Sequence, residues 1–412
     1  MRVPSSPVDL VAPDAIADPL RIFEELRRGG DAWWLERHKA WLLLGYELNR
    51  EALSLEQLST DNITPLQRHL SAEDRARFKP AADLLAGWMI FNDPPTHTAL
   101  RHPVRAAFTP RAVARLEAST AALVDRLLDA VDPAGFDVVD DLAYPLPAIV
   151  IAHLLGVPAD RHQEFQGWSR QLGALVMGKV SRPDAWDRAL AAARDLEELF
   201  SVMIEDRRAH PGEDLVSTLV HGSKEDGALT DHQLVGALSL LLFGGHETTT
   251  SLLTTGALHL MGAPERQRRL AADPGPAVEE LLRYEGPSKI VVRRVRYDGE
   301  WQGLALKAGQ PVFCALMAGN HDPAQFESPG ELRLDRDPNR HLSFGWGLHF
   351  CLGSQLARLE ARIVLPRLFE RFPDLELAVP REELRWQPTV VGRTLRRLPV
   401  RSAAAVREHL PL

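Results

Sequence analysis

A cysteine near the end of the chain lies in the segment best suited to chemistry. Residues 344–353 read FGWGLHFCLG and contain Cys351. Glycines allow the backbone to pass close to a flat ligand, and a helix expected from here to about Arg371 favours a thiolate at its start. A thiolate at this position is a metal ligand. A lone cysteine is more often a small buried hydrophobe, but the glycines, His349 and the helix start together favour the ligand.

A second polar segment interrupts the most apolar part of the chain. Residues 244–249 read GGHETT and follow an apolar run. A threonine hydroxyl that bonds back to the carbonyl four residues earlier opens a polar notch in an apolar helix, and a carboxylate beside a hydroxyl can hold and pass protons. Glu247 and Thr248 are therefore candidate proton-handling residues. Without the cysteine segment, threonines that fill a buried helix would be the preferred interpretation.

Two further residues could bind carboxylates of a ligand. His97 and Arg101 are four residues apart, on one face of a helix that starts after prolines. Each could instead be an exposed residue without a ligand, yet a dianionic group held inside a protein requires such donors.

A charged pair with a structural role is expected on a later helix. Glu280 and Arg283 are three residues apart, which places both on one helix face for a charge-assisted bond. Alone, this spacing is more typical of a solvated surface pair. We assign the pair to structure and not to catalysis.

Together these motifs resemble those of the cytochrome P450 family, the haem-thiolate monooxygenases, whose haem loop Phe-Gly-x-Gly-x-His-x-Cys-x-Gly is matched at every fixed position. The likeness spans roughly 93–356, and the first 90 residues match only in general pattern. It implies haem b with Cys351 as the axial iron ligand, since a cysteinate pushes electron density onto iron and favours O–O cleavage. It also implies these cofactor-binding residues: His97, Arg101, Gly244, Arg293, Phe344, Gly345, His349 and Gly353. Arg293 matches a propionate-binding arginine of the family, and the nearby Arg294 and Arg296 leave that register open.

The resemblance further implies a reaction. Thr248 would orient dioxygen, Glu247 would relay protons, and one oxygen atom from O2 would enter a small hydrophobic substrate by hydroxylation or epoxidation. Electrons would come from NAD(P)H through an external ferredoxin and ferredoxin reductase, and Glu280 with Arg283 would support the cysteine segment. Two alternatives remain at this point: a peroxide-using or non-hydroxylating haem-thiolate enzyme, and a haem-binding sensor without turnover. The acid–threonine pair favours oxygen and reductant.

The family's general layout also predicts a substrate pocket. Its apolar character indicates a hydrophobic small molecule held mainly by shape. The expected lining residues are Met89, Ile90, Leu175, Leu240, Phe243, Val291, Val292 and Val391.

The elements that position these residues are mostly helical. Apolar spacing predicts helices over 20–28, 112–131 and 185–208, and strands over 41–44 and 290–297. Glycines and prolines predict a segment without long helices over 309–340. The fold class expected is mainly α with small β-sheets (α+β), a triangular-prism cytochrome P450 fold formed as one domain over 1–412. Its β-rich part would cover roughly 1–90 and strands near 290–315, and its helical body roughly 91–285 and 352–372.

One long helix is expected to run through the centre of the molecule. Thr230 can cap it, Gln233 can reach back to complete a capping box, and Gly262 can end it before a proline. Gly244 and Gly245 weaken helix propensity midway, so a kink or an opened groove is predicted there.

Composition limits the remaining possibilities. The chain has 412 residues, a formal net charge of −8 and two cysteines. A disulfide scaffold or a four-cysteine metal site is therefore excluded, and binding to nucleic acid or membrane is not expected. No signal peptide is evident, and the apolar run 234–245 is too short to cross a bilayer. We expect a cytoplasmic monomer.

Two other motifs in the sequence are incomplete, and one group of arginines predicts a docking face. Residues 173–179 imitate a phosphate loop, but Val180 stands where a hydroxyl is needed, and Thr250 stands where a zinc protease needs its second histidine. A basic face for an acidic ferredoxin would consist of Arg105, Arg111, Arg115, Arg358 and Arg362.

Overall fold

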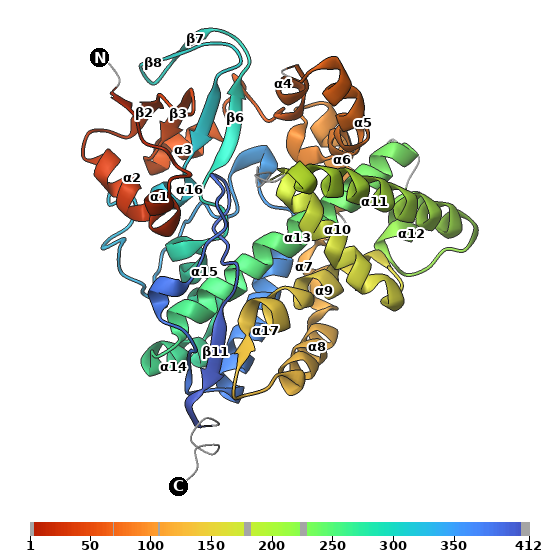
Figure 1. Cartoon of the computed structure of the whole chain (residues 1–412), viewed down its shortest axis with the longest axis vertical. Coiled ribbons are helices and arrows are strands. Elements are labelled where there is room, and N and C mark those ends of the chain that lie inside the picture. The colour runs from red at the N-terminus through yellow and green to blue at the C-terminus, as the bar shows by residue number, and fades with distance from the viewer. Residues whose placement is uncertain (1–3, 69, 106–107, 177–182, 223–228, 405–412) are drawn as a thin grey trace.

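Helices make up most of the molecule, and the largest sheet lies at one corner near the N-terminus (Figure 1). The computed structural model describes residues 4–68, 70–105, 108–176, 183–222 and 229–404. Its strands are β1 Ser5–Ser6, β2 Ala32–Leu35, β3 Ala40–Leu43, β4 Leu58–Ser59, β5 Phe136–Asp137, β6 Val291–Val295, β7 Gly299–Trp301, β8 Leu304–Leu306, β9 Pro311–Cys314, β10 Leu375–Leu377 and β11 Pro399–Ser402.

The helices account for the body of the molecule. They are α1 Pro13–Ala17, α2 Pro19–Arg27, α3 Tyr46–Ala52, α4 Ile63–Arg68, α5 Ala72–Ala86, α6 Thr96–Arg105, α7 Pro110–Ala114, α8 Glu117–Ala130, α9 Pro145–Leu155, α10 His162–Val176, α11 Pro183–Ala209, α12 Leu215–Val220, α13 Asp231–Leu260, α14 Pro264–Ala272, α15 Pro274–Glu285, α16 Leu316–Gly319 and α17 Ser354–Arg371. The architecture is mainly α with small sheets, which confirms the predicted fold class.

The largest sheet places two arginines on opposite faces. Its strand order is β1-β2-β3-β9-β6-β4. Side chains alternate along a strand, so Val291 and Val295 of β6 pack in one apolar cluster and Val292 packs against another. Arg293 therefore belongs to the first face of β6, and Arg294 belongs to the face of Val292.

The expected central helix is α13. Thr230 and Gln233 form the predicted capping box, and the helix ends at Leu260 before Gly262, whose φ is 67°. It runs through the middle of the molecule and packs against α9, α11 and α17 (Figure 1). The helix continues through Gly244 and Gly245 without an interruption. The low helix propensity of the two glycines therefore does not break α13.

Several boundaries differ from the sequence-based predictions. The single helix predicted over 112–131 is two helices, α7 and α8, because the chain turns at Leu116, whose amide bonds to the carbonyl of Val113. The region over roughly 1–90, predicted to be β-rich, contains β1 to β4 but also α1 to α5. Its last strand ends at Ser59, and α4 and α5 follow; Ser71 caps α5 by accepting a hydrogen bond from the Asp74 amide. The segment 309–340 contains β9 and only the short α16, as predicted.

One stretch is long and apolar enough to be tested as a membrane span. Val138–Leu155, which includes α9, meets the length and composition criteria, but 67% of it is buried inside the molecule. That burial is typical of a core segment.

Candidate functional site

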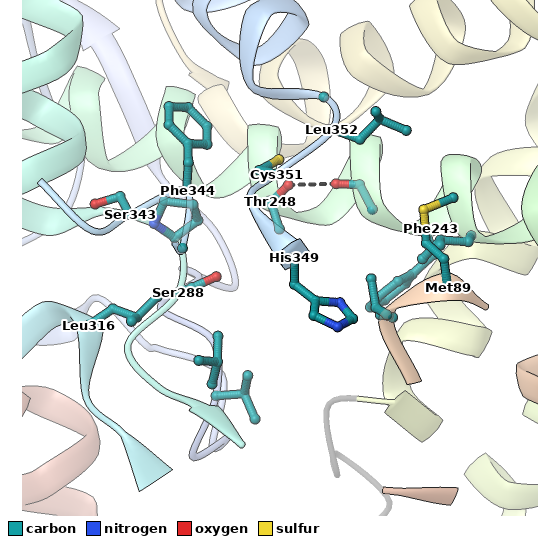
Figure 2. A pocket seen from close by; sticks show the side chains of 18 of the residues that line it. Met89, Phe243, Thr248, Ser288, Leu316, Ser343, Phe344, His349, Cys351 and Leu352 are labelled. Atoms are coloured by element: carbon teal, nitrogen blue, oxygen red, sulfur yellow. Dashed lines mark hydrogen bonds between the residues drawn. The ribbon is translucent and has the colours of Figure 1, made fainter. Parts of the chain in front are cut away.

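A cavity of about 620 Å³ lies between α13, β6 and the loop before α17. Figure 2 shows Met89 and Phe243 on one side of the open space and Ser288 and Leu316 on the other, with the His349 ring pointing between them. Both Cys351 and Thr248 line this cavity. The structure thus brings the two chemical segments of the sequence to one place.

Local backbone geometry aims the cysteine loop at the cavity. Gly345 and Gly347 have φ values of 72° and 71°, which favour glycine. A Cβ at Gly347 would lie 2.7 Å from the Ser54 hydroxyl, so a side chain there has no room. The Cys351 amide donates to the Phe344 carbonyl at 2.8 Å, which closes the loop before α17 begins at Ser354.

Burial and the local charges act on Cys351 in opposite directions. Burial raises the pKa of its thiol, although the Gly353 amide and the guanidinium groups of Arg101 and Arg358 oppose that shift. The thiolate expected from the sequence therefore has donors beside it that favour it, and it stays a prediction for the protein without its cofactor. A cation bound at Sγ would restore the thiolate. The other cysteine, Cys314, is fully enclosed in β9, and burial raises its pKa to about 11.

Donors for anionic groups lie at this cavity or next to it, and none pairs with a carboxylate among the described residues. His97 is buried in α6, and neither ring nitrogen has a hydrogen-bond partner among the described residues. Its ring centroid lies 4.1 Å from that of His349. Arg101 donates to the Phe350 carbonyl at 2.7 Å, and buried Arg293 donates to the Val292 carbonyl at 3.2 Å. Burial, followed by His97 and Arg293, lowers the pKa of His349 to about 3.

This donor set fits the haem that the sequence resemblance implies. Cys351 lines a cavity whose wall also carries Arg101, Arg293 and His349, and the unpartnered His97 ring lies against His349. The two propionates of haem would neutralise such a cluster, which is costly to bury alone. Among the described residues Arg296 instead pairs with Asp93 at 2.9 Å. That contact favours Arg293 in the predicted register.

The two proton-handling candidates take different positions on α13. The Thr248 hydroxyl faces the cavity and donates to the Gly244 carbonyl at 2.7 Å (Figure 2), as the predicted notch requires. A Cβ at Gly244 would meet nothing within 4 Å, so the notch is open. Glu247 is buried and does not line the cavity, because it lies against Gly173 of α10. The structure therefore brings Thr248, but not Glu247, to the cavity wall.

Glu247 belongs to a polar group behind α13 that sequence reasoning missed. His246 is enclosed between the Ser169 hydroxyl at 2.8 Å and the Tyr144 carbonyl at 2.9 Å, and burial lowers its pKa to about 4. Burial first and Glu247 second raise the pKa of Tyr144, so its phenol stays protonated. The Arg170 guanidinium lies 4.1 Å from the centre of the Tyr144 ring.

Most residues predicted to line a substrate pocket lie in the wall of the cavity. Met89, Ile90, Leu240, Phe243, Val291, Val292 and Val391 all line the cavity. The side chain of Leu175 lies outside the described residues. Sequence reasoning missed the polar lining residues Asn62, Ser288 and Arg294. Asn62 lies in the N-terminal region, which matches the family only weakly. Of the three, only Arg294 could have been suspected from the sequence, because it belongs to the arginine cluster at 293–296.

The charged pair on α15 forms a buried network. Arg283 donates to both carboxylate oxygens of Glu280 at 2.7 and 2.9 Å, and both side chains are fully buried. Arg283 also donates to the carbonyls of Asn320 and Glu331, and Arg336 donates to Glu280 at 3.0 Å. The spacing-based prediction of a charge-assisted bond is confirmed. The network ties α15 to the segment that leads into the cysteine loop.

The candidate docking face is less basic than the sequence indicated. Arg358 donates two hydrogen bonds to Glu279, at 2.6 and 2.8 Å, and lies 4.3 Å from the centre of the Phe344 ring. Its charge is therefore neutralised at the loop and is not presented to a partner. Arg105, Arg111 and Arg115 form no ion pair within the part of the chain that the structure describes.

Comparison with known proteins identifies similar chains. The cytochrome P450 family model matches residues 33–273 and 276–390. The polyketide biosynthesis cytochrome P450 PksS of Bacillus subtilis is 34% identical over 391 residues, which cover 93% of this chain and 92% of that protein. The cytochrome P450 monooxygenase PikC of Streptomyces venezuelae is 37% identical over 402 residues, covering 94% and 92%.

Solved structures give the same result at the level of the fold. The complex of P450BioI with an acyl carrier protein carrying hexadec-9Z-enoic acid has a TM-score of 0.86 at 31% identity, covering 95% of this chain and all of that one. The crystal structure of CalO2 has a TM-score of 0.88 at 29% identity and covers 97% and 99%.

Proposed function

The chain belongs to the cytochrome P450 family and is a haem-thiolate monooxygenase, and we propose that Cys351 is the residue that binds its haem iron. The observation that carries this assignment is the shared cavity: the Cys351 sulfur and the Thr248 hydroxyl line one space from α17's loop and from α13. When bound, a thiolate-ligated haem supplies the activation of dioxygen that the side chains cannot perform.

The chain's own residues would hold the cofactor and its charge. We propose that His97, Arg101, Arg293 and His349 bind the haem propionates. Arg101, Arg293 and His349 line the cavity, His97 lies against His349, and none of the four pairs with a carboxylate among the described residues. The Gly353 amide with Arg101 and Arg358 would stabilise the charge on Cys351. Phe344 would pack beside the sulfur, and Gly244, Gly345 and Gly353 would let the backbone approach the cofactor closely.

Thr248 and Glu247 would handle protons from two sides of α13. Because the Thr248 hydroxyl donates to Gly244, its oxygen lone pairs are free to accept a hydrogen bond from the cavity side. Glu247 would relay protons from behind the helix, next to Arg170 and Tyr144. Delivery from Glu247 therefore needs a water or a side-chain rotation, because its carboxylate does not line the cavity.

The substrate class follows from the pocket walls. Met89, Phe243, Val291 and Val391 present apolar surface, and Trp88 stacks on Phe243 with ring centroids 5.1 Å apart. We propose a hydrophobic small molecule that is oxygenated by hydroxylation or epoxidation. Relatives of 38% and 36% identity are named as a vitamin D(3) 25-hydroxylase and a 6-deoxyerythronolide B hydroxylase, which supports an apolar substrate.

Electrons would come from outside the domain. We propose that NAD(P)H reduces the haem through a ferredoxin reductase and a ferredoxin in the cytoplasm, with the chain acting as a monomeric single domain. Arg105, Arg111 and Arg115 support a basic docking face. Replacing these three arginines by glutamate should slow ferredoxin-dependent reduction; an unchanged reduction rate would reject this face.

The absorption spectrum of the reduced carbon monoxide complex tests the proposed function. Thiolate ligation moves the main band far to the red of a histidine-ligated haem, so purified haem-loaded protein should show the red-shifted band. Cys351→Ala should abolish it, whereas Cys314→Ala, which removes the enclosed cysteine of β9, should keep it. A red-shifted band retained in Cys351→Ala would overturn the assignment. Turnover with ferredoxin and NAD(P)H should exceed turnover with hydrogen peroxide.

A further inference from the structure

Two polar side chains in the cavity wall have no role in the proposed chemistry. Arg294 of β6 and Asn62, which precedes α4, both line the cavity. The Nε atom of Arg294 and the Oδ1 atom of Asn62 are buried, and neither has a hydrogen-bond partner among the described residues. A buried unpaired polar atom costs roughly 1–3 kcal/mol. Such atoms at a cavity wall indicate a ligand that would pair with them.

Arg294 does not belong to the proposed propionate-binding set. It occupies the face of β6 opposite to Arg293, together with Val292, which packs against the cluster that contains Phe313. Its Nη1 atom donates to the Gly309 carbonyl at 3.2 Å, so the rest of the guanidinium group is available. Burial lowers the pKa of Arg294, and only Asp61 opposes that shift, but an arginine stays charged.

Asn62 lies along the same edge of the strand. Its Nδ2 atom donates to the carbonyls of Thr60 at 3.1 Å and Val292 at 3.4 Å. Val292, whose carbonyl Asn62 contacts, and Arg294 are two residues apart on β6, which corresponds to ~6–7 Å along the strand. Asp61, the nearby acid, accepts hydrogen bonds from the amides of Ile63 and Thr64 and forms no ion pair with Arg294. The charge of Arg294 is therefore not compensated by a direct partner in the described structure.

We propose that Arg294 and Asn62 form an anchoring subsite for the carboxylate end of a hydrophobic organic acid. Arg294 binds the carboxylate. The side-chain oxygen Oδ1 of Asn62 accepts a hydrogen bond from a hydroxyl or amide N–H that lies next to the carboxylate in the ligand. The apolar part of the acid then extends along Val292 and Phe243 towards Thr248. This subsite deepens the proposed function and rests on it, because it names the class of molecule that the monooxygenase would hold.

Ligand titrations of the haem-loaded protein test the subsite without measuring turnover. The low-to-high-spin absorbance change at pH 7.5 gives a dissociation constant for dodecanoic acid, methyl dodecanoate and 3-hydroxydodecanoic acid. Since charge-assisted hydrogen bonds contribute about 1.5–3 kcal/mol, the wild-type protein should bind dodecanoic acid at least about tenfold more tightly than its methyl ester. The hydroxy acid should bind more tightly than the plain acid.

Variants separate the contributions of Arg294 and Asn62 to ligand binding. Arg294→Gln should weaken acid binding about tenfold or more and leave ester binding within about twofold, and Arg294→Lys should recover part of the acid binding. Asn62→Leu should remove the advantage of the hydroxy acid. Lys307→Gln is the matched control, because Lys307 is exposed, pairs with Asp298 and does not line the cavity. It should leave all three dissociation constants unchanged.

Three outcomes would overturn the proposal. Equal binding of acid and ester by the wild-type protein would show that no carboxylate anchor exists. If Arg294→Gln weakened the binding of acid and ester equally and also lost haem, as Arg293→Gln is expected to do, Arg294 would be assigned to the cofactor. Unchanged acid binding in Arg294→Gln would exclude this side chain. A red-shifted carbon monoxide band in the same preparation separates each result from a failure of the proposed function.

Discussion

The Thr248 hydroxyl of α13 faces the cavity, and a hydrogen bond to the Gly244 carbonyl fixes its orientation. Its bond to the Gly244 carbonyl points the hydroxyl proton along the helix and leaves the oxygen to the cavity. Thr248→Ala would remove the acceptor and admit disordered water. A positioned proton-handling group contributes a factor of about 100 or more.

Thr248→Ala should therefore lower the yield of oxygenated product per NAD(P)H consumed by at least about tenfold, while reductant consumption continues. Product and NAD(P)H measured in the same reaction give this ratio. Thr254→Ala is the control, because the Thr254 hydroxyl is buried, bonds to the Thr250 carbonyl at 2.6 Å and does not line the cavity. A ratio that falls equally in both variants would show only damage to α13.

A second residue, Glu360 of α17, predicts how stability depends on pH. It is fully buried, neither carboxylate oxygen has a partner among the described residues, and burial raises its pKa well above the ordinary value. The folded protein keeps this proton while the unfolded chain releases it above about pH 4.3. Folding stability is therefore greatest below the unfolded pKa and falls as the pH rises towards the folded pKa.

Glu360→Gln removes that proton from both states. The stability of the wild-type protein relative to Glu360→Gln should thus decline between pH 5.5 and 8.5, by up to about 1.4 kcal/mol per pH unit. Urea unfolding of both proteins at several pH values measures the difference. Glu370→Gln, on the exposed side of the same helix, should show no such trend. Parallel pH profiles for wild type and Glu360→Gln would contradict the prediction.

Local motifs revealed the residues whose roles depend on nearby backbone, whereas contacts between distant segments remained hidden. The FGWGLHFCLG run indicated Cys351 because its glycines and helix start are consecutive in the chain. The orientation of Glu247 depends on Gly173 in α10, and the orphaned atom of Asn62 depends on β6. Neither of these long-range contacts leaves a periodic signal.

At the scale of elements, α5 and α13 approach each other at a pair of glycines. A Cβ added at Gly236 would lie 2.5 Å from the Gly87 Cα, and one added at Gly87 would lie 2.8 Å from the Gly236 Cα. These contacts are with backbone atoms, which cannot rotate away. The close approach also lets the Trp88 indole donate to the Ser239 hydroxyl of α13 at 2.8 Å.

Gly236→Ala should therefore separate the two helices and lower the free energy of unfolding by about 1–3 kcal/mol, as overpacking does. Gly167→Ala is the matched control, since Gly167 lies inside α10 and an added Cβ would meet nothing within 4 Å. It should stabilise the protein by about 0.4–1 kcal/mol. Urea unfolding of both variants measures these changes, and equal effects would show that the crossing is not tightly packed.

Element types and ends were predictable where capping residues are explicit. Thr230 and Gln233 indicated the start of α13, and both hydrogen bonds of the capping box are present. The break between α7 and α8 was missed because residues 112–131 keep helical apolar spacing across Leu116. Only the tertiary packing of α7 and α8 against α17 reveals two separate helices.

At the scale of the whole molecule, the cavity joins parts of the chain that are far apart in sequence. Its proposed propionate donors come from α6, from β6 of the sheet and from the loop before α17. Without an anion, Arg101 and Arg293 leave positive charge near Cys351, and the propionates of a bound haem would pair with both arginines and accept hydrogen bonds from the two histidines. Haem binding and folding should therefore be coupled across the molecule.

Arg293→Gln tests this coupling because Arg293 is the buried donor contributed by the sheet. Haem at 1,000 times its dissociation constant stabilises a protein by about 4 kcal/mol, and each tenfold loss of affinity removes about 1.4 kcal/mol of that gain. The thermal midpoints with and without haem should lie closer together in Arg293→Gln than in the wild-type protein, while the exposed control Arg37→Gln should keep the wild-type difference. An undiminished difference in Arg293→Gln would mean that Arg293 does not share in holding the cofactor.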